Sequence, residues 1–99
     1  MIESEADLVT ASVKIAKQVG VYLERVGQRD ARGSGSDRGV TDTLLSINGH
    51  YLPIEFKFGD NKMSKAQEEA ARKRADNGVF TFVPYTLEDF IDIIEMFHR

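Results

Sequence analysis

The sequence predicts an α/β domain in which a mixed sheet is flanked by helices, and three observations support this expectation. Segments with apolar residues at helical spacing alternate with short segments rich in β-branched and aromatic residues, in the order α-β-β-β-α-β-α. Asn48-Gly49 separates two of the β segments, and this dipeptide is typical of a two-residue hairpin. The 99 residues contain neither a linker nor a repeat, so we expect one domain over 1–99.

The first helix is predicted over residues 5–18. Ser4 followed by Asp7 is typical of a helix N-cap with an acidic third residue, and Gly20 stands where a C-terminal cap is expected. The short segment 21–26 is rich in residues that favour strands. The chain therefore begins with a helix followed directly by a strand.

A loop is predicted over 27–39, because this segment is rich in glycine and arginine and has no apolar residue larger than alanine. Two strands follow over 40–47 and 50–58, joined by the Asn48-Gly49 turn. Together they form the central hairpin of the predicted sheet.

The next helix is predicted over 64–76, where Ser64 and Gln67 have the spacing of a capping box. A fourth strand is predicted over 79–84. Thr86 then caps the last helix, which has an apolar stripe suited to packing on a sheet. The stripe consists of Leu87, Phe90, Ile91, Ile94 and Phe97.

The composition excludes several classes of protein. There is no cysteine, hence no disulfide, cysteine-bound zinc or thiol nucleophile, and the isolated His50 and His98 lack metal-ligand spacing. No apolar run is long enough for a membrane span, and the acidic N-terminus is unlike a signal peptide, so we expect a cytoplasmic protein. Residues 8–74 hold 12 Lys and Arg against 8 Asp and Glu, a net charge of +4, which weakly favours a polyanionic partner.

The hairpin turn predicts which side chains lie opposite each other. If 47 and 50 flank the turn, Asp42 lies directly opposite Glu55, and Lys57 shares their face of the sheet. Two opposed carboxylates repel each other, and Mg²⁺ or Mn²⁺ would relieve the repulsion. A surface hairpin with salt bridges to Lys57 is the alternative.

A third carboxylate is predicted beside this pair. Glu5 continues the face of the first helix that carries Leu8, Ser12 and Ile15, and this face should pack on the sheet. An inward carboxylate needs a partner, and a metal ion would supply one. In the alternative, the negative charge of Glu5 only stabilises the N-terminus of the helix through the helix dipole. Glu3 is the other candidate.

Asp42, twelve intervening residues and then Glu55-Phe56-Lys57 resemble the D…ExK signature of the PD-(D/E)xK nuclease superfamily. Gly39-Val40-Thr41-Asp42 resembles the G-x-P-D entry of this superfamily, with Thr41 in place of proline. Ser64-Lys65-Ala66-Gln67 resembles its S-x-x-Q segment. The combination resembles the virus-type replication-repair nuclease (VRR-NUC) group, which implies a restriction-endonuclease-like αβββαβ core.

The resemblance also implies a metal site. Asp42 and Glu55 would bind one or two Mg²⁺ ions, for which Mn²⁺ would substitute. The backbone carbonyl of Phe56 would be a further ligand, and Glu5 would complete the set directly or through water. No organic cofactor is implied.

Two more residues complete the implied catalytic set with Asp42 and Glu55. Lys57 would orient the attacking water or stabilise charge in the transition state. Gln67 would reach the same site from its helix, although its position in a capping box explains the residue equally well.

The implied function is a Mg²⁺-dependent, structure-selective DNA endonuclease, similar to a Holliday-junction resolvase of phage or prophage origin. Two cuts need two sites, so a homodimer is expected. The alternatives are a flap or linear-duplex nuclease, a DNA-binding module without catalysis, and an interaction protein that docks through its acidic last helix. The cationic side chains expected to contact DNA are Arg25, Arg29, Arg32, Arg38, Lys62 and Lys65.

Overall fold

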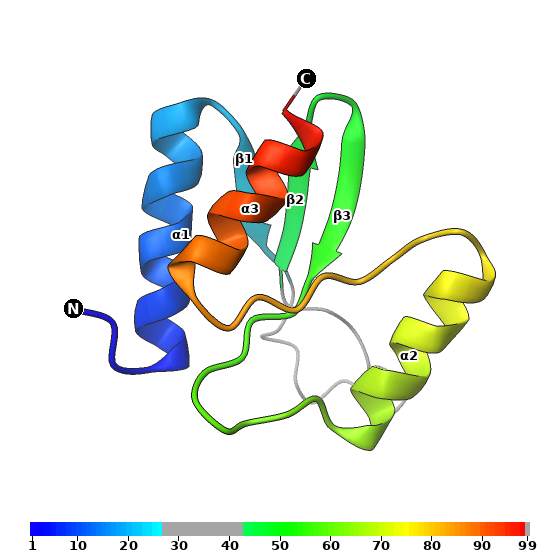
Figure 1. The fold of residues 1–99 in the computed structure, drawn as a ribbon. Helices are drawn as coiled ribbons and strands as arrows, with labels where there is room; N and C mark the ends of the chain where they lie inside the picture. The colour runs from blue at the N-terminus through cyan, green and yellow to red at the C-terminus, as the bar shows by residue number, and fades with distance from the viewer. Residues whose placement is uncertain (27–42, 99) are drawn as a thin grey trace.

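The computed structural model describes residues 1–26 and 43–98 (Figure 1). These residues form α1 (Glu5–Val19), β1 (Tyr22–Arg25), β2 (Thr43–Ile47), β3 (His50–Ile54), α2 (Lys65–Asp76) and α3 (Leu87–Phe97). All three helices and the first three strands were predicted in this order. Among the described helices, none is both long enough and apolar enough to cross a membrane.

The sheet has the strand order β1-β2-β3, and both pairs are antiparallel. The β2–β3 register runs from Ile47 opposite His50 to Thr43 opposite Ile54, which confirms the register predicted from the turn. Asn48 and Gly49 have φ values of 48° and 84°, so both central residues of the turn have the left-handed conformation that a two-residue hairpin of this type needs.

The strand predicted over 79–84 is reduced to one parallel bridge, between Phe82 and Ile54. Glu55 extends the contact, because its N–H donates to the Phe82 carbonyl at 2.7 Å. Val79 and Phe80 are exposed, and Pro84 has no N–H to donate, so the ladder stays short. The antiparallel sheet and the parallel bridge give the predicted mixed sheet.

The prediction that β3 continues to residue 58 is wrong, since the strand ends at Ile54. The segment around Phe82 bonds to Pro53 and Glu55 at this end of β3, and the register positions opposite 55–58, which are 39–42, lie outside the described residues. The predicted strand over 40–47 starts at Thr43 within the described residues, and positions 40–42 lie outside them.

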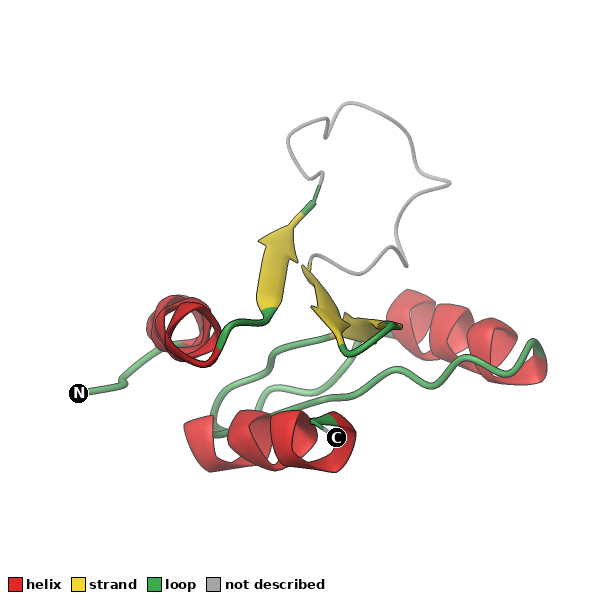
Figure 2. Ribbon diagram, turned by 90° about the horizontal axis from the view of Figure 1, so that it is seen from above, coloured by secondary structure: helices red, strands yellow, loops and turns green. Residues whose placement is uncertain are grey.

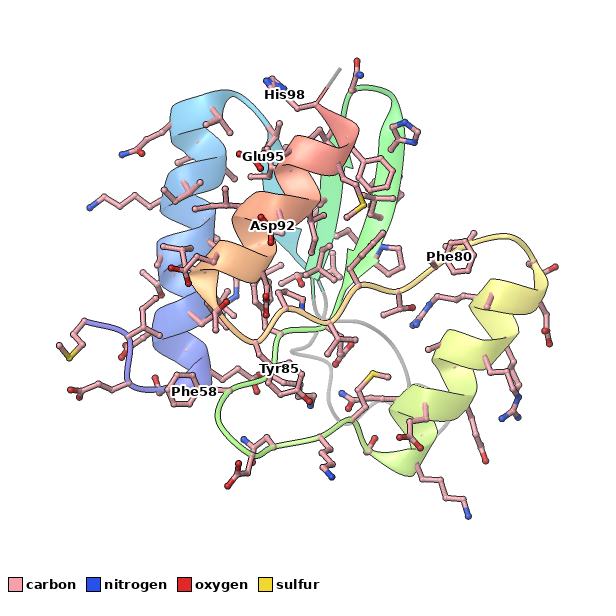
Figure 3. The ribbon with its side chains drawn as sticks, viewed as in Figure 1. Phe58, Phe80, Tyr85, Asp92, Glu95 and His98 are labelled. Carbon is pink, nitrogen blue, oxygen red and sulfur yellow. The ribbon has the colours of Figure 1, made fainter. Side chains whose placement is uncertain are left out.

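Helices α1 and α3 pack on one face of the sheet and enclose the core, and Figure 2 shows α3 beneath the strands with α1 beside β1. In both views α2 lies on the side of the sheet away from α1, and none of its residues is buried. Asp92 and Glu95 lie on the outer face of α3 (Figure 3). The core consists of Leu8, Val9, Ala16, Leu23, Leu45, Ile47, Ile54, Phe56, Phe90, Ile93 and Ile94.

Ser12 is the exception in this apolar core. Its side chain is fully buried on α1, and its hydroxyl has no hydrogen-bond partner among the described residues. A buried hydroxyl without a partner costs free energy, and alanine is a better helix former than serine. We therefore expect Ser12→Ala to raise the free energy of unfolding by about 1 kcal/mol, and the melting temperature by about 4–8 °C. Urea unfolding measures the change, and a less stable variant would contradict the expectation.

Candidate active site

Glu55 is the most deeply buried acidic side chain of the described residues, with 6% of its surface exposed. It follows β3 directly, and its backbone is held by the hydrogen bond to Phe82. Its carboxylate oxygen Oε2 accepts a hydrogen bond from Gln67 Nε2 at 2.5 Å. A buried carboxylate is costly unless charge or hydrogen bonds compensate it, so this position indicates a functional role.

Glu5 lies close to this carboxylate in the fold. The Ser4 hydroxyl accepts a hydrogen bond from the Asp7 N–H at 3.1 Å, which caps α1 and fixes Glu5 as its first residue. Glu5 is half-buried, whereas Glu3 is exposed and its N–H donates to the Asp7 carboxylate. Of the two candidate glutamates, the structure places Glu5 beside Glu55.

A small pocket of about 140 Å³ joins these side chains at the end of the sheet where β1 ends and β2 begins. Two glutamates and one arginine line it together with mostly apolar residues. A site of this kind can hold a cation between the acids and receive an anion beside the arginine. Among the described residues its lining is Glu5, Ala6, Val9, Arg25, Thr43, Glu55 and Phe56.

Thr43 ties two strands together at the pocket. It is buried, and its hydroxyl donates a hydrogen bond to the Ile54 carbonyl across the β2–β3 ladder. Arg25 is its partner in the β1–β2 register. Backbone pairing therefore fixes Arg25 and Thr43 at the pocket, and Glu55 follows directly on Ile54, the other partner of Thr43.

Asp42, which precedes Thr43 in the sequence, lies outside the described residues, so its predicted position opposite Glu55 stays a prediction. The same holds for Arg29, Arg32 and Arg38. Within 1–26 and 43–98, no three carboxylate or histidine side chains are arranged to hold a metal ion.

Phe56 and Lys57 follow Glu55 but have different surroundings. Phe56 lines the pocket, and its buried ring packs on Phe90 with 5.7 Å between the ring centroids. Lys57 is half-buried and does not line the pocket, although its N–H is fixed by the Pro84 carbonyl at 3.2 Å. The structure thus brings Glu5, Arg25, Glu55 and Phe56 together and leaves Lys57 at a neighbouring position.

Gln67 makes a hydrogen bond on each of the two sides that the sequence left open, the helix cap and the predicted site. Its Oε1 accepts a hydrogen bond from the Ser64 N–H at 2.9 Å, which completes the capping box of α2. Its Nε2 donates to Glu55. Because the cap occupies the amide oxygen, the amide nitrogen is the end directed at the carboxylate. The helix cap thereby orients a donor for the site.

Lys62 and Lys65 are exposed, and their contact with DNA stays a prediction. Lys62 lies in the loop before α2, at a hollow that also contains Asp60 and Tyr85. Lys65, three residues after Lys62, is the first residue of α2. Neither lysine lines the pocket with Glu55.

Arg25 has a position that the sequence did not predict in detail. It was expected only as one of several DNA-contacting cations, and the structure places it in the wall of the carboxylate pocket. The only indication in the sequence was its place at the end of a predicted strand. The link from β1 to β2 is long, so it gives no turn from which the pairing of Arg25 with Thr43 could be derived.

The fold is similar to those of two solved structures described as VRR-NUC domains. The first is 17% identical, with a TM-score of 0.74, and the match covers 95% of this chain and 97% of that one. The second is 20% identical, with a TM-score of 0.76, and covers 96% and 88% respectively. No family model and no curated protein matches the sequence. The chain therefore has the fold of these VRR-NUC domain structures.

Proposed function

We propose that the chain is a single VRR-NUC-type domain and a metal-dependent DNA endonuclease of the PD-(D/E)xK class. The observation that carries the proposal is the pocket in which Glu5 and the buried Glu55 lie beside Arg25. It occurs in a chain with the fold of the VRR-NUC domain structures. The D…ExK spacing of Asp42, Glu55 and Lys57 supports the same activity.

The donor set fits a small, hard cation. Carboxylate oxygens are the ligands that Mg²⁺ and Mn²⁺ prefer, and the pocket has room for an ion with its waters. Glu5 and Glu55 would hold the ion, together with Asp42 and the Phe56 carbonyl. When bound, Mg²⁺ supplies a Lewis acid for the phosphate and lowers the pKa of a water.

The residues of the chain position the reactants. Gln67 fixes the direction of the Glu55 carboxylate through its hydrogen bond. Lys57 stabilises negative charge as it develops on the phosphate oxygens. In the hydrolysis, the oxygen of water forms a bond to phosphorus, and the bond to one ester oxygen breaks. The water loses a proton to the solvent, and the leaving alkoxide gains one, so charge and atoms balance.

We propose branched DNA as the substrate and a homodimer as the active form, because the described part of each chain has one pocket that joins Glu5, Arg25 and Glu55, and a junction needs two cuts. The cytoplasm of a bacterium or of a phage-infected cell is the proposed compartment. A flap or linear-duplex nuclease would use the same residues with a different DNA surface.

A substrate panel tests this proposal. Purified protein is incubated with a four-way junction, a flap, a fork and a matched linear duplex, each with Mg²⁺, Mn²⁺ or EDTA. We expect cleavage with either metal, none with EDTA, and the fastest cleavage on the junction. Equal cleavage rates on the junction and on the linear duplex would contradict the proposed junction preference. Cleavage in EDTA would contradict the proposed metal dependence.

The absence of cleavage on every substrate would favour a DNA-binding module without catalysis. Thermal unfolding with added Mn²⁺ separates this case, because an ion that binds the folded state raises the melting temperature. A DNA-binding module with a degenerate site would bind the junction and show no shift with Mn²⁺. If the protein neither binds DNA nor shows a shift in melting temperature with Mn²⁺, the result would instead favour an interaction protein.

A further inference from the structure

Arg25 is the one cationic side chain among the described residues that line the pocket with Glu5 and Glu55. We propose that Arg25 is a catalytic residue, whose guanidinium donates hydrogen bonds to the non-bridging oxygens of the phosphate that is cut. This inference rests on the proposed nuclease function. It goes beyond the D…ExK residues, because Arg25 lies on β1, outside that signature.

The strand pairing gives Arg25 a fixed place in the site. Arg25 is the last residue of β1 and the register partner of Thr43, the first residue of β2. Thr43 is in turn the partner of Ile54, and Glu55 follows directly. The cation and the buried carboxylate are therefore carried by the same end of three adjacent strands. Backbone hydrogen bonds hold the two groups at the pocket, independently of any bound DNA.

The charge of the pocket suits this role. Two carboxylates that share a small pocket favour a cation beside them, and a guanidinium keeps its charge at any pH of interest. Once a metal ion is bound to the two carboxylates, the guanidinium is available to bind a phosphate. The planar guanidinium matches two oxygens of a phosphate with two parallel hydrogen bonds.

Glu55 and Arg25 differ in how much of each side chain is exposed to solvent. Glu55 is almost completely buried, so it stays within the pocket, whereas Arg25 is exposed and open to a polymer arriving from solvent. A phosphate that reaches the metal ion must enter the same pocket that Arg25 lines. The arginine therefore contacts the reacting phosphate, rather than a phosphate further along the DNA. It donates hydrogen bonds and transfers no proton.

The two kinds of contact have different kinetic effects. A contact to a distant phosphate contributes equally to the ground state and the transition state, so its loss weakens DNA binding. A contact to the reacting phosphate strengthens as negative charge develops, so its loss lowers the rate of the chemical step. The ratio of these two effects identifies the role of Arg25.

The experiment compares Arg25→Ala and Arg25→Lys with the wild type on a four-way junction. Single-turnover cleavage at saturating protein and Mg²⁺ gives the rate, and the Kd is measured with Ca²⁺ to suppress cutting. We expect Arg25→Ala to lower the rate about 30-fold while the Kd rises less than about threefold. Arg25→Lys keeps the positive charge but cannot make the bidentate pair of hydrogen bonds. Its rate should therefore lie between those of Arg25→Ala and the wild type.

Lys14→Ala is the matched control. Lys14 is exposed on α1, nine residues or about 13 Å along the helix from Glu5, and its loss also removes one positive charge. This variant should cut at the wild-type rate. If Arg25→Ala keeps the wild-type rate, or affects only the Kd, Arg25 is an ordinary DNA contact and the inference is wrong.

A titration without DNA separates this failure from failure of the proposed function. Removal of a positive charge from the pocket should tighten Mn²⁺ binding, and we expect Arg25→Ala to lower the Kd for Mn²⁺ about fivefold by calorimetry. An unchanged Kd would show that Arg25 does not share the electrostatic environment of the ion, which overturns the inference alone. If the wild type neither binds Mn²⁺ nor cuts any DNA, the nuclease function and this role are both excluded.

Discussion

Glu55→Gln should lower the single-turnover cleavage rate at least about 1000-fold, the largest effect that we expect from any single substitution in this chain. The buried carboxylate is the acid that the fold fixes most firmly at the pocket. Glutamine has nearly the same shape and still offers an oxygen to the Gln67 amide. The variant loses the negative charge needed to hold a divalent cation, while its packing is preserved.

Three measurements confine this effect to the metal site. The melting temperature of Glu55→Gln should be no lower than that of the wild type, because a buried charge is replaced by a neutral group. DNA binding in Ca²⁺ should be retained, and the Mn²⁺ affinity measured without DNA should fall. A variant that cuts within tenfold of the wild-type rate would show that Glu55 is not a metal ligand.

Glu24→Gln is the matched control for this charge. Glu24 is half-buried on β1, next to Arg25, and its carboxylate accepts a hydrogen bond from the Tyr51 hydroxyl. It does not line the pocket. The loss of one negative charge from this position should leave the cleavage rate within about twofold, which separates an effect at the metal site from a general change in net charge.

Local signals in the sequence were sufficient to predict the elements of the fold and part of the site. Asn48-Gly49 determines the hairpin register, and the observed pairs around it follow from the turn alone. Ser4 likewise fixes the start of α1, and with it the place of Glu5. These features depend on residues a few positions apart, whose geometry is set by backbone hydrogen bonds.

Features that depend on contacts distant in sequence were harder to predict. The alternation of faces along a strand does not show that β3 ends at Ile54, or that the distant segment around Phe82 bonds to it. Arg25 at the pocket depends on the β1–β2 pairing, for which the sequence contains no turn signal. The burial of Glu55 also required the three-dimensional fold, since strand periodicity alone placed it on a face, without saying how enclosed that face is.

The hydrogen bond between α2 and the pocket has a consequence for catalysis. No residue of α2 is buried, so apolar packing contributes little to its position. Among the contacts of the described residues, Gln67 links the start of the helix to Glu55, and Arg74 links its end to the Thr81 hydroxyl at 2.8 Å. The capping box therefore directs the Gln67 amide nitrogen at the Glu55 carboxylate. The same hydrogen bond holds the start of α2 at the pocket.

Gln67→Glu separates the two roles of this side chain, because glutamate serves as well as glutamine in a capping box. One carboxylate oxygen still accepts from the Ser64 N–H, so helix stability should be preserved. The other oxygen replaces the Nε2 donor and faces Glu55 with a second negative charge. We expect the cleavage rate near pH 8 to fall about 100-fold, with a change in melting temperature of less than about 2 °C.

The pH dependence distinguishes positioning from a structural effect. A carboxyl group at residue 67, placed against Glu55, has its pKa raised, because two negative charges at short range are unfavourable. Below that raised pKa the carboxyl is protonated and can again donate a hydrogen bond to Glu55. The rate of the variant relative to the wild type should therefore increase as the pH falls, whereas a damaged helix would lower the ratio equally at every pH.

Ser64→Ala provides the complementary control. It removes the hydroxyl that accepts from the Gln67 N–H at 3.1 Å, and leaves the Gln67 side chain bonded to the Ser64 backbone and to Glu55. We expect a loss of about 1 kcal/mol in the free energy of unfolding, and a change of less than about threefold in rate. If Ser64→Ala slows cleavage as much as Gln67→Glu does, the rate depends on helix stability, and the amide of Gln67 has no separate role at the carboxylate.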